Sequence, residues 1–326
     1  MSATNTGHAR ATQGDLAVAG DAAIAVEHLA KSYGATVAVN DLSFSVRMGE
    51  IFALLGPNGA GKTTTIETLE GYRVADSGVA RVLGLDPRRD AARLKPRVGV
   101  MLQQDGLYQT LRAREILALY ASFYANPEDP AELMERVGLT SAADTRFRQL
   151  SGGQKRRLAL AVAIIGKPDL LFLDEPTTGM DPQARRATWE IIQQQQARGV
   201  TILLTTHFMD EAERLADRIA IMDGGQLIAL DTPAALTTSQ STTGTELRFR
   251  APPGLDLVAL GKLSFVRAAH EESPGVYALE TGEPRELLVQ LATLFRDTGV
   301  DVSEVRIGRS TLEDVFIRLT GKEMRE

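Results

Sequence analysis

Apolar residues in the first two thirds of the chain fall in short continuous runs that do not alternate with polar residues. Such runs are typical of parallel strands that are buried on both faces. They predict strands at 51–55, 98–102, 170–174 and 201–205. Helical spacing appears between them, in a helix starting near 62 and in helices at 155–165 and 183–197. This alternation of strands and helices predicts an α/β domain with a largely parallel sheet.

Other segments complete the predicted organisation. Strands are expected at 23–26, 42–46 and 79–83, a mostly helical insertion at 111–125 and 131–137, and a hairpin at 218–222 and 226–229. Past a polar linker, strands at 246–250, 276–280 and 302–307 and helices at 285–298 and 311–320 suggest a small α+β domain. We therefore expect a disordered tail (1–22), a main domain (23–236) with a helical subdomain (about 104–155), a linker (237–245) and a C-terminal assembly or regulatory domain (246–326).

Composition narrows the possible functions. The 326 residues include 44% hydrophobic and 24% charged residues, with a net charge of -6. This modest acidity argues against a nucleic-acid partner, which favours a basic surface. The chain has no cysteine, so neither disulfides nor thiolate chemistry are possible. No run approaches the ~18 apolar residues of a membrane helix, and the first twenty or so residues do not resemble a secretory signal.

A glycine-rich loop follows the apolar run at 51–55. Residues 56–63 match G-x-x-x-x-G-K-[ST] at every fixed position, between a predicted strand and a predicted helix. Glycines let backbone N–H groups surround a phosphate, and the helix N-terminus adds donors; a glycine-rich turn without a ligand is the alternative. Lys62 would reach the β- and γ-phosphates, and Thr63 would bind Mg²⁺. The predicted ATP-binding residues here are Gly56, Pro57, Asn58, Gly59, Ala60, Gly61, Lys62, Thr63 and Thr64.

Two consecutive carboxylates, Asp174 and Glu175, end the apolar strand that begins at Leu170. Open α/β sheets hold their ligands at such strand ends. Neighbouring strand residues point to opposite sides, so the two carboxylates must have different roles. Asp174 suits binding Mg²⁺ through water, and Glu175 suits polarising the water that attacks the γ-phosphate. A solvated acidic turn, the alternative, fits poorly behind four apolar residues.

Three further side chains are candidates with open alternatives. His207 follows the strand at 201–205, where a neutral imidazole can donate to a γ-phosphate oxygen and hold Glu175 or the water in place. Gln103, at another strand end, suits binding Mg²⁺ or orienting water, but equally suits a solvated loop. Tyr33 could stack on an adenine, or be an ordinary loop tyrosine.

A second glycine-bearing turn, Ser151-Gly152-Gly153, precedes a predicted helix. The N-terminus of a helix can bind an anion. Ordinary capping of the helix by Ser151 explains the same residues, and on their own they favour capping.

Taken in order, these motifs resemble the nucleotide-binding subunit of ATP-binding cassette (ABC) transporters over about residues 23–236. The pentapeptide Leu150-Ser151-Gly152-Gly153-Gln154 is similar to the signature of that family, and other P-loop ATPases lack it. Gln103 is followed by a second glutamine where a carboxylate is common, so the position of the Q-loop residue stays slightly open. The resemblance implies roles for the adenine-stacking Tyr33, the Mg²⁺ ligands Thr63, Gln103 and Asp174, the catalytic Glu175, the D-loop Asp181, the switch His207 and the signature residues Ser151, Gly152, Gly153 and Gln154.

The resemblance also implies a fold and partners. The fold is that of an ABC-type P-loop NTPase, with a mixed sheet, an antiparallel β subdomain and a helical insertion. Two copies would enclose ATP and Mg²⁺ head to tail, and a separate membrane-spanning permease would hold them at the cytoplasmic face of a bacterial membrane. The D-loop 179–182 and the segment 310–316 resemble drug- and antibiotic-resistance exporters of the daunorubicin-resistance type. This branch implies export of a drug, antibiotic or lipid-like compound.

Two rival functions use the same motifs. A soluble cassette ATPase acting on nucleic acid or the ribosome usually carries two cassettes or a long coiled coil, and the span from Lys62 to Leu150 is too short for a long coiled coil. A scaffold that does not hydrolyse ATP would need a broken motif at Asp174, Glu175 or His207. All three of these residues are present in the sequence.

Overall fold

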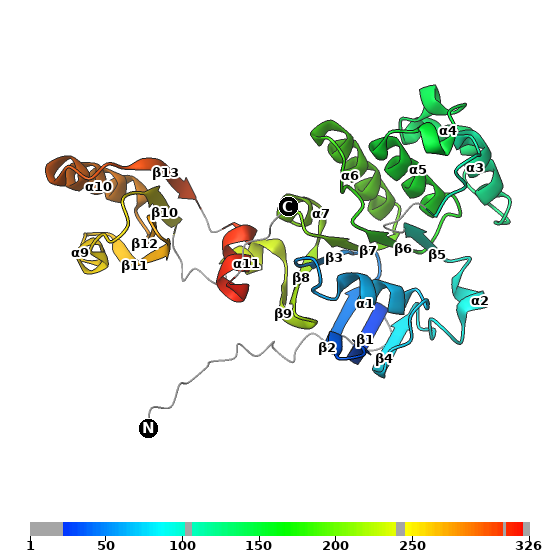
Figure 1. Ribbon diagram of the computed structural model, residues 1–326, viewed down its shortest axis with the longest axis horizontal. Coiled ribbons are helices and arrows are strands. Elements are labelled where there is room, and N and C mark those ends of the chain that lie inside the picture. The colour runs from blue at the N-terminus through cyan, green and yellow to red at the C-terminus, as the bar shows by residue number, and fades with distance from the viewer. Residues whose placement is uncertain (1–21, 102–105, 239–244, 309–310, 322–326) are drawn as a thin grey trace. The chain divides into compact units, whose positions relative to one another are not determined.

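The computed structural model describes residues 22–101, 106–238, 245–308 and 311–321. The chain divides near residue 233 into two compact units (Figure 1). Among the described residues, no helix has both the length and the apolar character needed to cross a membrane.

A six-stranded sheet with the order β5-β6-β7-β3-β8-β9 forms the centre of the first unit. Its strands are β3 (Ile51–Leu55), β5 (Val98–Met101), β6 (Leu170–Asp174), β7 (Thr201–Thr206), β8 (Arg218–Asp223) and β9 (Gln226–Asp231). All pairs are parallel except β8–β9. Every residue of β3, β6 and β7 is buried, as their continuous apolar runs predict. The predicted mixed sheet is confirmed.

A second sheet in the first unit is antiparallel and consists of β1 (Ala22–Tyr33), β2 (Thr36–Arg47) and β4 (Ser77–Val82). Its buried residues share one hydrophobic core with those of the six-stranded sheet. Phe44 of this sheet stacks on Phe52 of β3, with ring centroids 5.3 Å apart. The sequence predicted much shorter first strands and a turn including Tyr33. Strand β1 runs on to Tyr33 because its pairing with β2 continues to that residue, through several register shifts that local alternation does not reveal.

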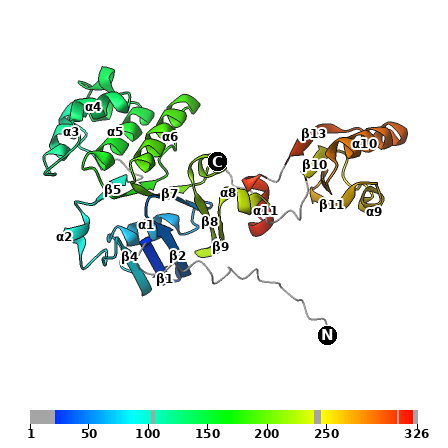
Figure 2. The same ribbon diagram turned by 180° about the vertical axis from the view of Figure 1, so that it is seen from behind.

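The helices of the first unit fall into two groups. Helices α3 (Ala113–Ala121), α4 (Pro130–Arg136) and α5 (Gly152–Ile164) contact one another and form the helical insertion. Figures 1 and 2 both show them on the side of the six-stranded sheet opposite to the antiparallel sheet. The others are α1 (Lys62–Leu69), α2 (Ala91–Leu94), α6 (Pro182–Ala197) and α7 (Met209–Leu215), with 3₁₀ turns at Thr140–Ala142 and Phe147–Gln149.

The second unit contains an antiparallel sheet with the order β11-β12-β10-β13. In chain order, the helices and strands of this unit are α8 (Pro233–Thr238), β10 (Thr245–Arg250), α9 (Leu257–Gly261), β11 (Val266–Ser273), β12 (Val276–Thr281), α10 (Pro284–Thr298), β13 (Ser303–Gly308) and α11 (Leu312–Thr320). The run from β10 to β13 is a βαββαβ unit of ferredoxin-like topology. Sequence patterns did not predict α9 or β11, because α9 has only five residues and β11 is mostly half-buried or exposed.

Candidate ATP-binding and hydrolysis site

The phosphate loop joins the buried end of β3 to the start of α1. Gly61 caps α1 with φ at 98°, a left-handed conformation that glycine adopts without strain. A Cβ atom at Gly61 would lie 2.3 Å from the carbonyl oxygen of Ala38, and one at Gly56 would lie 2.3 Å from that of Met222. Ala60 accepts a hydrogen bond from the Gly225 N–H. The loop therefore needs glycine at these points to fit against β8 and β2.

We predict that Gly61→Ala lowers both thermal stability and ATP affinity, because the new methyl group would displace the loop or the β2 backbone. The control is Gly59→Ala. Gly59 also has a positive φ, at 83°, but nothing lies within 4 Å of a Cβ built there. Thermal unfolding and ATP titration of both variants should show the larger loss for Gly61→Ala. Equal losses would mean that glycine is needed at position 61 because of backbone strain and not because of the close approach to Ala38.

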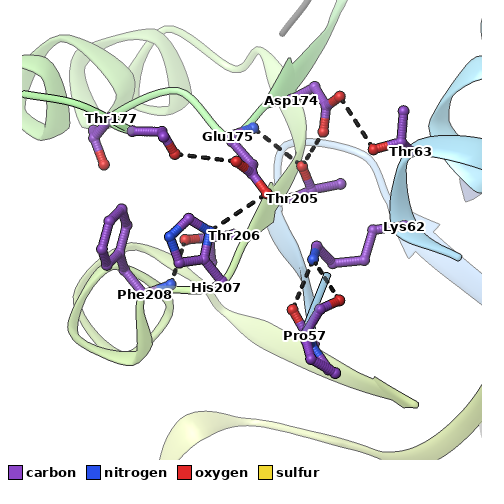
Figure 3. Close-up of polar contacts among 12 residues, drawn as sticks. Pro57, Lys62, Thr63, Asp174, Glu175, Thr177, Thr205, Thr206, His207 and Phe208 are labelled. Carbon is purple, nitrogen blue, oxygen red and sulfur yellow. Dashed lines mark hydrogen bonds and ion pairs between the residues drawn. The ribbon is translucent and has the colours of Figure 1, made fainter. Parts of the chain in front are cut away.

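Lys62 lies over this loop with its ammonium group buried. Its Nζ donates to the carbonyl oxygens of Gly56 (2.7 Å) and Pro57 (3.1 Å), as Figure 3 shows. Burial lowers the pKa of Lys62, and the nearby charges of Glu175 and Asp174 oppose that shift. The loop, the ammonium group and the two carboxylates thus form one cluster.

Asp174 faces the start of α1 from the end of β6. Its Oδ2 lies 3.4 Å from the Thr63 hydroxyl, and its other oxygen accepts a hydrogen bond from the hydroxyl of Thr205. Burial raises the pKa of Asp174, which the Thr205 hydrogen bond and Lys62 partly offset. Mg²⁺ is usually bound by one or two carboxylates together with substrate phosphates. A carboxylate and a hydroxyl facing each other beside a phosphate loop fit this ion.

Glu175 has a strained backbone, with φ at 49°. Its N–H donates to the Thr205 hydroxyl (3.0 Å) and lies 3.1 Å from the Thr205 carbonyl oxygen. One carboxylate oxygen accepts from the Thr178 hydroxyl at 3.2 Å, and the other lies 3.4 Å from Nδ1 of His207. Figure 3 shows the carboxylate directed toward the imidazole. These contacts fix the position of the carboxylate next to a group that can donate or accept a proton.

Sequence reasoning did not single out two supporting groups. Thr205 contacts both Asp174 and Glu175, and it is the register partner of Asp174 in the sheet. Glu211, fully buried, accepts from the Thr177 hydroxyl (2.7 Å) and from Nε1 of Trp189 (2.9 Å). Thr205 could have been found as the hydroxyl side chain at the same level of the neighbouring parallel strand. The sequence carries no comparable signal for Glu211.

The remaining predicted residues take no part in the side-chain contacts described above. Tyr33 is 42% exposed at the end of β1, with Lys31 Nζ 5.5 Å and Arg73 Cζ 5.6 Å from its ring centroid. Asn58 and Gly59 are exposed, and Thr64 is half-buried. Gln103 lies outside the described residues.

The signature residues form the N-terminus of α5. The Ser151 hydroxyl accepts from the Gln154 N–H, and the Gln154 side chain accepts from the Ser151 N–H, which makes a capping box. Ser151 and Gly152 are exposed. Asp181 caps α6 in a similar way, accepting from the N–H groups of Gln183 and Ala184. In the part of the chain that the structure describes, no hydrogen bond or ion pair joins residues 151–154 to the phosphate loop.

Comparisons with known proteins agree with this geometry. Residues 39–178 match the family model described as "ABC transporter". The chain is 40% identical over 314 residues to "Nod factor export ATP-binding protein I" of Paraburkholderia xenovorans (strain LB400), covering 94% of this chain and 99% of the relative. It is 42% identical over 308 residues to the protein of the same name from Rhizobium sp. (strain N33), covering 93% and 98%.

Solved structures show the same fold. The "Structure of ATP binding subunit of ABC transporter" is 30% identical, with a TM-score of 0.61 over 66% of this chain and 92% of that chain. A dimeric post-hydrolysis ATP-binding cassette bound to ADP and Pi is 22% identical, with a TM-score of 0.59 over 64% and 98%. The fold and site define a P-loop ATPase. Within that class, the chain belongs to the ATP-binding subunits of ABC transporters, which couple ATP hydrolysis to transport.

Proposed function

We propose that Glu175 is the general base of ATP hydrolysis and that His207 orients it. Its carboxylate is the only one of the two at the end of β6 that lies beside an imidazole, at 3.4 Å. Asp174 is instead directed to the Thr63 hydroxyl. Glu175 accepts the proton of the attacking water. His207 holds the Glu175 carboxylate in place and donates a hydrogen bond to a γ-phosphate oxygen. The different neighbours of these two adjacent carboxylates are the observation that carries the proposal.

The phosphate loop and Lys62 bind the triphosphate, and Tyr33 stacks on the adenine. Thr63, Asp174 and Gln103 hold Mg²⁺. When bound, Mg²⁺ neutralises charge on the β- and γ-phosphates. Lys62 leaves its carbonyl partners in the loop and donates to phosphate oxygens, because these carry the greater negative charge.

A second copy of the chain completes the site. Ser151 and Gly152 of the signature turn are exposed, and among the described residues no hydrogen bond or ion pair joins this turn to the phosphate loop of its own chain. A head-to-tail pair with two-fold symmetry brings Ser151–Gln154 of one copy to the nucleotide on Lys62 of the other. Asp181 lies near the same interface. ATP then joins the copies, and loss of the γ-phosphate separates them.

The open and closed states drive a separate membrane-spanning permease at the cytoplasmic face of a bacterial membrane. We propose export as the direction, because the curated relatives are export ATP-binding proteins and the resemblance to drug- and antibiotic-resistance exporters points the same way. The cargo is a drug, an antibiotic or a lipid-like compound. The rival function on nucleic acid has less support, since the chain carries a net charge of -6. Fractionation with membranes only when the permease is co-expressed would distinguish the two.

We predict that Lys62→Ala weakens ATP binding by ~10-fold or more, because a charge-assisted hydrogen bond contributes about 1.5–3 kcal/mol. Titration with a fluorescent ATP analogue measures the effect. Lys262→Ala, which removes an exposed lysine from the second unit, is the control. Unchanged affinity in Lys62→Ala would contradict the role of the loop as a phosphate site.

A further inference from the structure

Glu211 is a buried acid that joins three segments around the hydrolysis site. It lies on α7, the helix that follows His207, and its exposed fraction is 0%. Its Oε1 accepts hydrogen bonds from the Thr177 hydroxyl (2.7 Å) and from Nε1 of Trp189 (2.9 Å). One carboxyl oxygen therefore holds α7 both to the turn that follows β6 and to α6.

Each of these three segments carries a predicted site residue. The turn after β6 begins with Glu175, whose carboxylate accepts a hydrogen bond from Thr178 of the same turn. Helix α6 is capped by Asp181. His207 precedes α7, and its Nδ1 lies 3.4 Å from the Glu175 carboxylate. The contact between Glu175 and His207 thus spans the same two segments that Glu211 joins.

A second set of contacts holds the segment after His207 against α6. Arg185 on α6 places its guanidinium carbon 4.1 Å from the ring centroid of Phe208, and its Nη1 lies 3.7 Å from Oδ2 of Asp210. The Phe208 ring lies 4.1 Å from the His207 imidazole, measured between ring centroids. Helix α6 therefore supports this segment at two levels, at Phe208 and at Glu211.

The hydrogen bonds of Glu211 fit a neutral carboxylic acid. Its Oε1 accepts two hydrogen bonds, whereas Oε2 is buried and has no hydrogen-bond partner among the described residues. A neutral acid accepts with one oxygen and carries its proton on the other. Burial also raises the pKa of Glu211, and its hydrogen-bond donors and the charge of Arg185 oppose that shift. Glutamine has the same arrangement of one acceptor and one donor atom.

Packing alone does not require an acid at this position. Ala212 and Leu215 on the same helix are buried and apolar, and an apolar side chain at 211 would avoid the cost of burying a carboxyl group. A buried carboxyl group is tolerated where it satisfies buried donors, and Thr177 and Trp189 are two such donors. Because these donors belong to segments that carry site residues, the contact bears on the geometry of the site.

We propose that Glu211 is a positioning residue for ATP hydrolysis, which sets the distance between Glu175 and His207 by joining Thr177 to α7. The inference rests on the proposed function, since it uses the roles given there to Glu175 and His207. Because its side chain is fully buried, Glu211 acts through these two residues and does not touch the nucleotide.

The first test compares Glu211→Leu with Glu211→Gln. Leucine removes the acceptor oxygen and keeps a side chain of similar size, whereas glutamine can still accept from Thr177 and Trp189. We expect Glu211→Leu to lower kcat by ~10-fold or more, because a small displacement of catalytic groups is costly. The KM for ATP should stay within about 2-fold, since the nucleotide contacts are unchanged. Glu211→Gln should restore most of the wild-type kcat, and Glu213→Leu, the same change at an exposed position of α7, is the control.

The second test removes the donor side of the contact. Thr177→Val keeps the shape of the side chain and should also lower kcat, and adding it to Glu211→Leu should cause no further loss, because both changes break one contact. The control is Thr201→Val, which removes a buried hydroxyl that accepts from the Gly49 N–H and should keep the wild-type kcat. Trp189 is the only tryptophan in the chain, so its fluorescence reports whether α6 still packs against position 211 in each variant.

A purely structural role of Glu211 would change stability alone. The positioning role is wrong if Glu211→Leu and Thr177→Val unfold at lower temperatures but keep the wild-type kcat where both are folded. It is also wrong if Glu211→Gln is as slow as Glu211→Leu, because glutamine retains the acceptor. If Glu211→Leu does not fold, Thr177→Val decides the question by the same comparison of kcat with KM.

His207→Ala separates this inference from the proposed function. In that background Glu211→Leu should slow turnover by less than about 2-fold, because no imidazole remains to be positioned. If His207→Ala hydrolyses ATP at the wild-type rate, the proposed role of His207 fails, and this inference fails with it. If His207→Ala and Glu175→Gln are slow while Glu211→Leu and Thr177→Val are not, the role of Glu211 is wrong and the proposed function stands.

Discussion

Glu175→Gln is expected to lower ATP turnover by ~10²-fold or more and leave ATP binding nearly unchanged. Glutamine keeps the size of the side chain and can still contact the Thr178 hydroxyl, but it cannot accept a proton from water. Because the γ-phosphate is then retained, the variant should accumulate as a dimer with Mg²⁺-ATP. Steady-state phosphate release, ATP titration and light scattering measure the three quantities.

The matched control for this change is Glu190→Gln, which neutralises an exposed carboxylate on α6. It should hydrolyse ATP at the wild-type rate and remain in the wild-type equilibrium between monomer and dimer. Near-normal turnover by Glu175→Gln would remove Glu175 from the role of base. A loss of ATP binding equal to the loss of turnover would instead make it a binding residue.

Ser151→Arg should abolish ATP-driven dimerisation, even in the Glu175→Gln background that otherwise traps the dimer. Ser151 is exposed at the N-terminus of α5, so a long cationic side chain there would block the approach of a second copy to the nucleotide. The phosphate loop of the same chain is untouched, so the monomer should keep its ATP affinity. Light scattering of the double variant with Mg²⁺-ATP tests this expectation.

Loss of the helix cap at Ser151 is a second way in which Ser151→Arg could prevent dimerisation, and it must be distinguished from a blocked interface. Replacing Ser151 removes a capping box, which costs about 1 kcal/mol of stability, so thermal unfolding should accompany the measurement. Ser273→Arg, a similar change at an exposed residue of the second unit, should leave the trapped dimer intact. If the Ser151→Arg double variant still dimerises and the single variant hydrolyses ATP normally, the shared site is wrong.

The sequence by itself determined the family and the α/β fold, and it predicted the catalytic motifs. Each motif is a contiguous segment whose residues act through their own backbone or at the end of one strand. It can therefore be recognised from the order of consecutive residues alone. The buried runs of β3, β6 and β7 and the glycines of the phosphate loop could be read in this way. The predicted roles of the site residues stay predictions until the variants above are measured.

The tertiary structure decided what depends on neighbours far apart in the chain. Thr205 contacts both Asp174 and Glu175 only because β7 lies next to β6 in that register. Glu211 is buried against Thr177 and Trp189 only because α6 and α7 pack together. Long-range packing decides which polar side chains meet across neighbouring elements, and no local pattern of residues encodes these pairs.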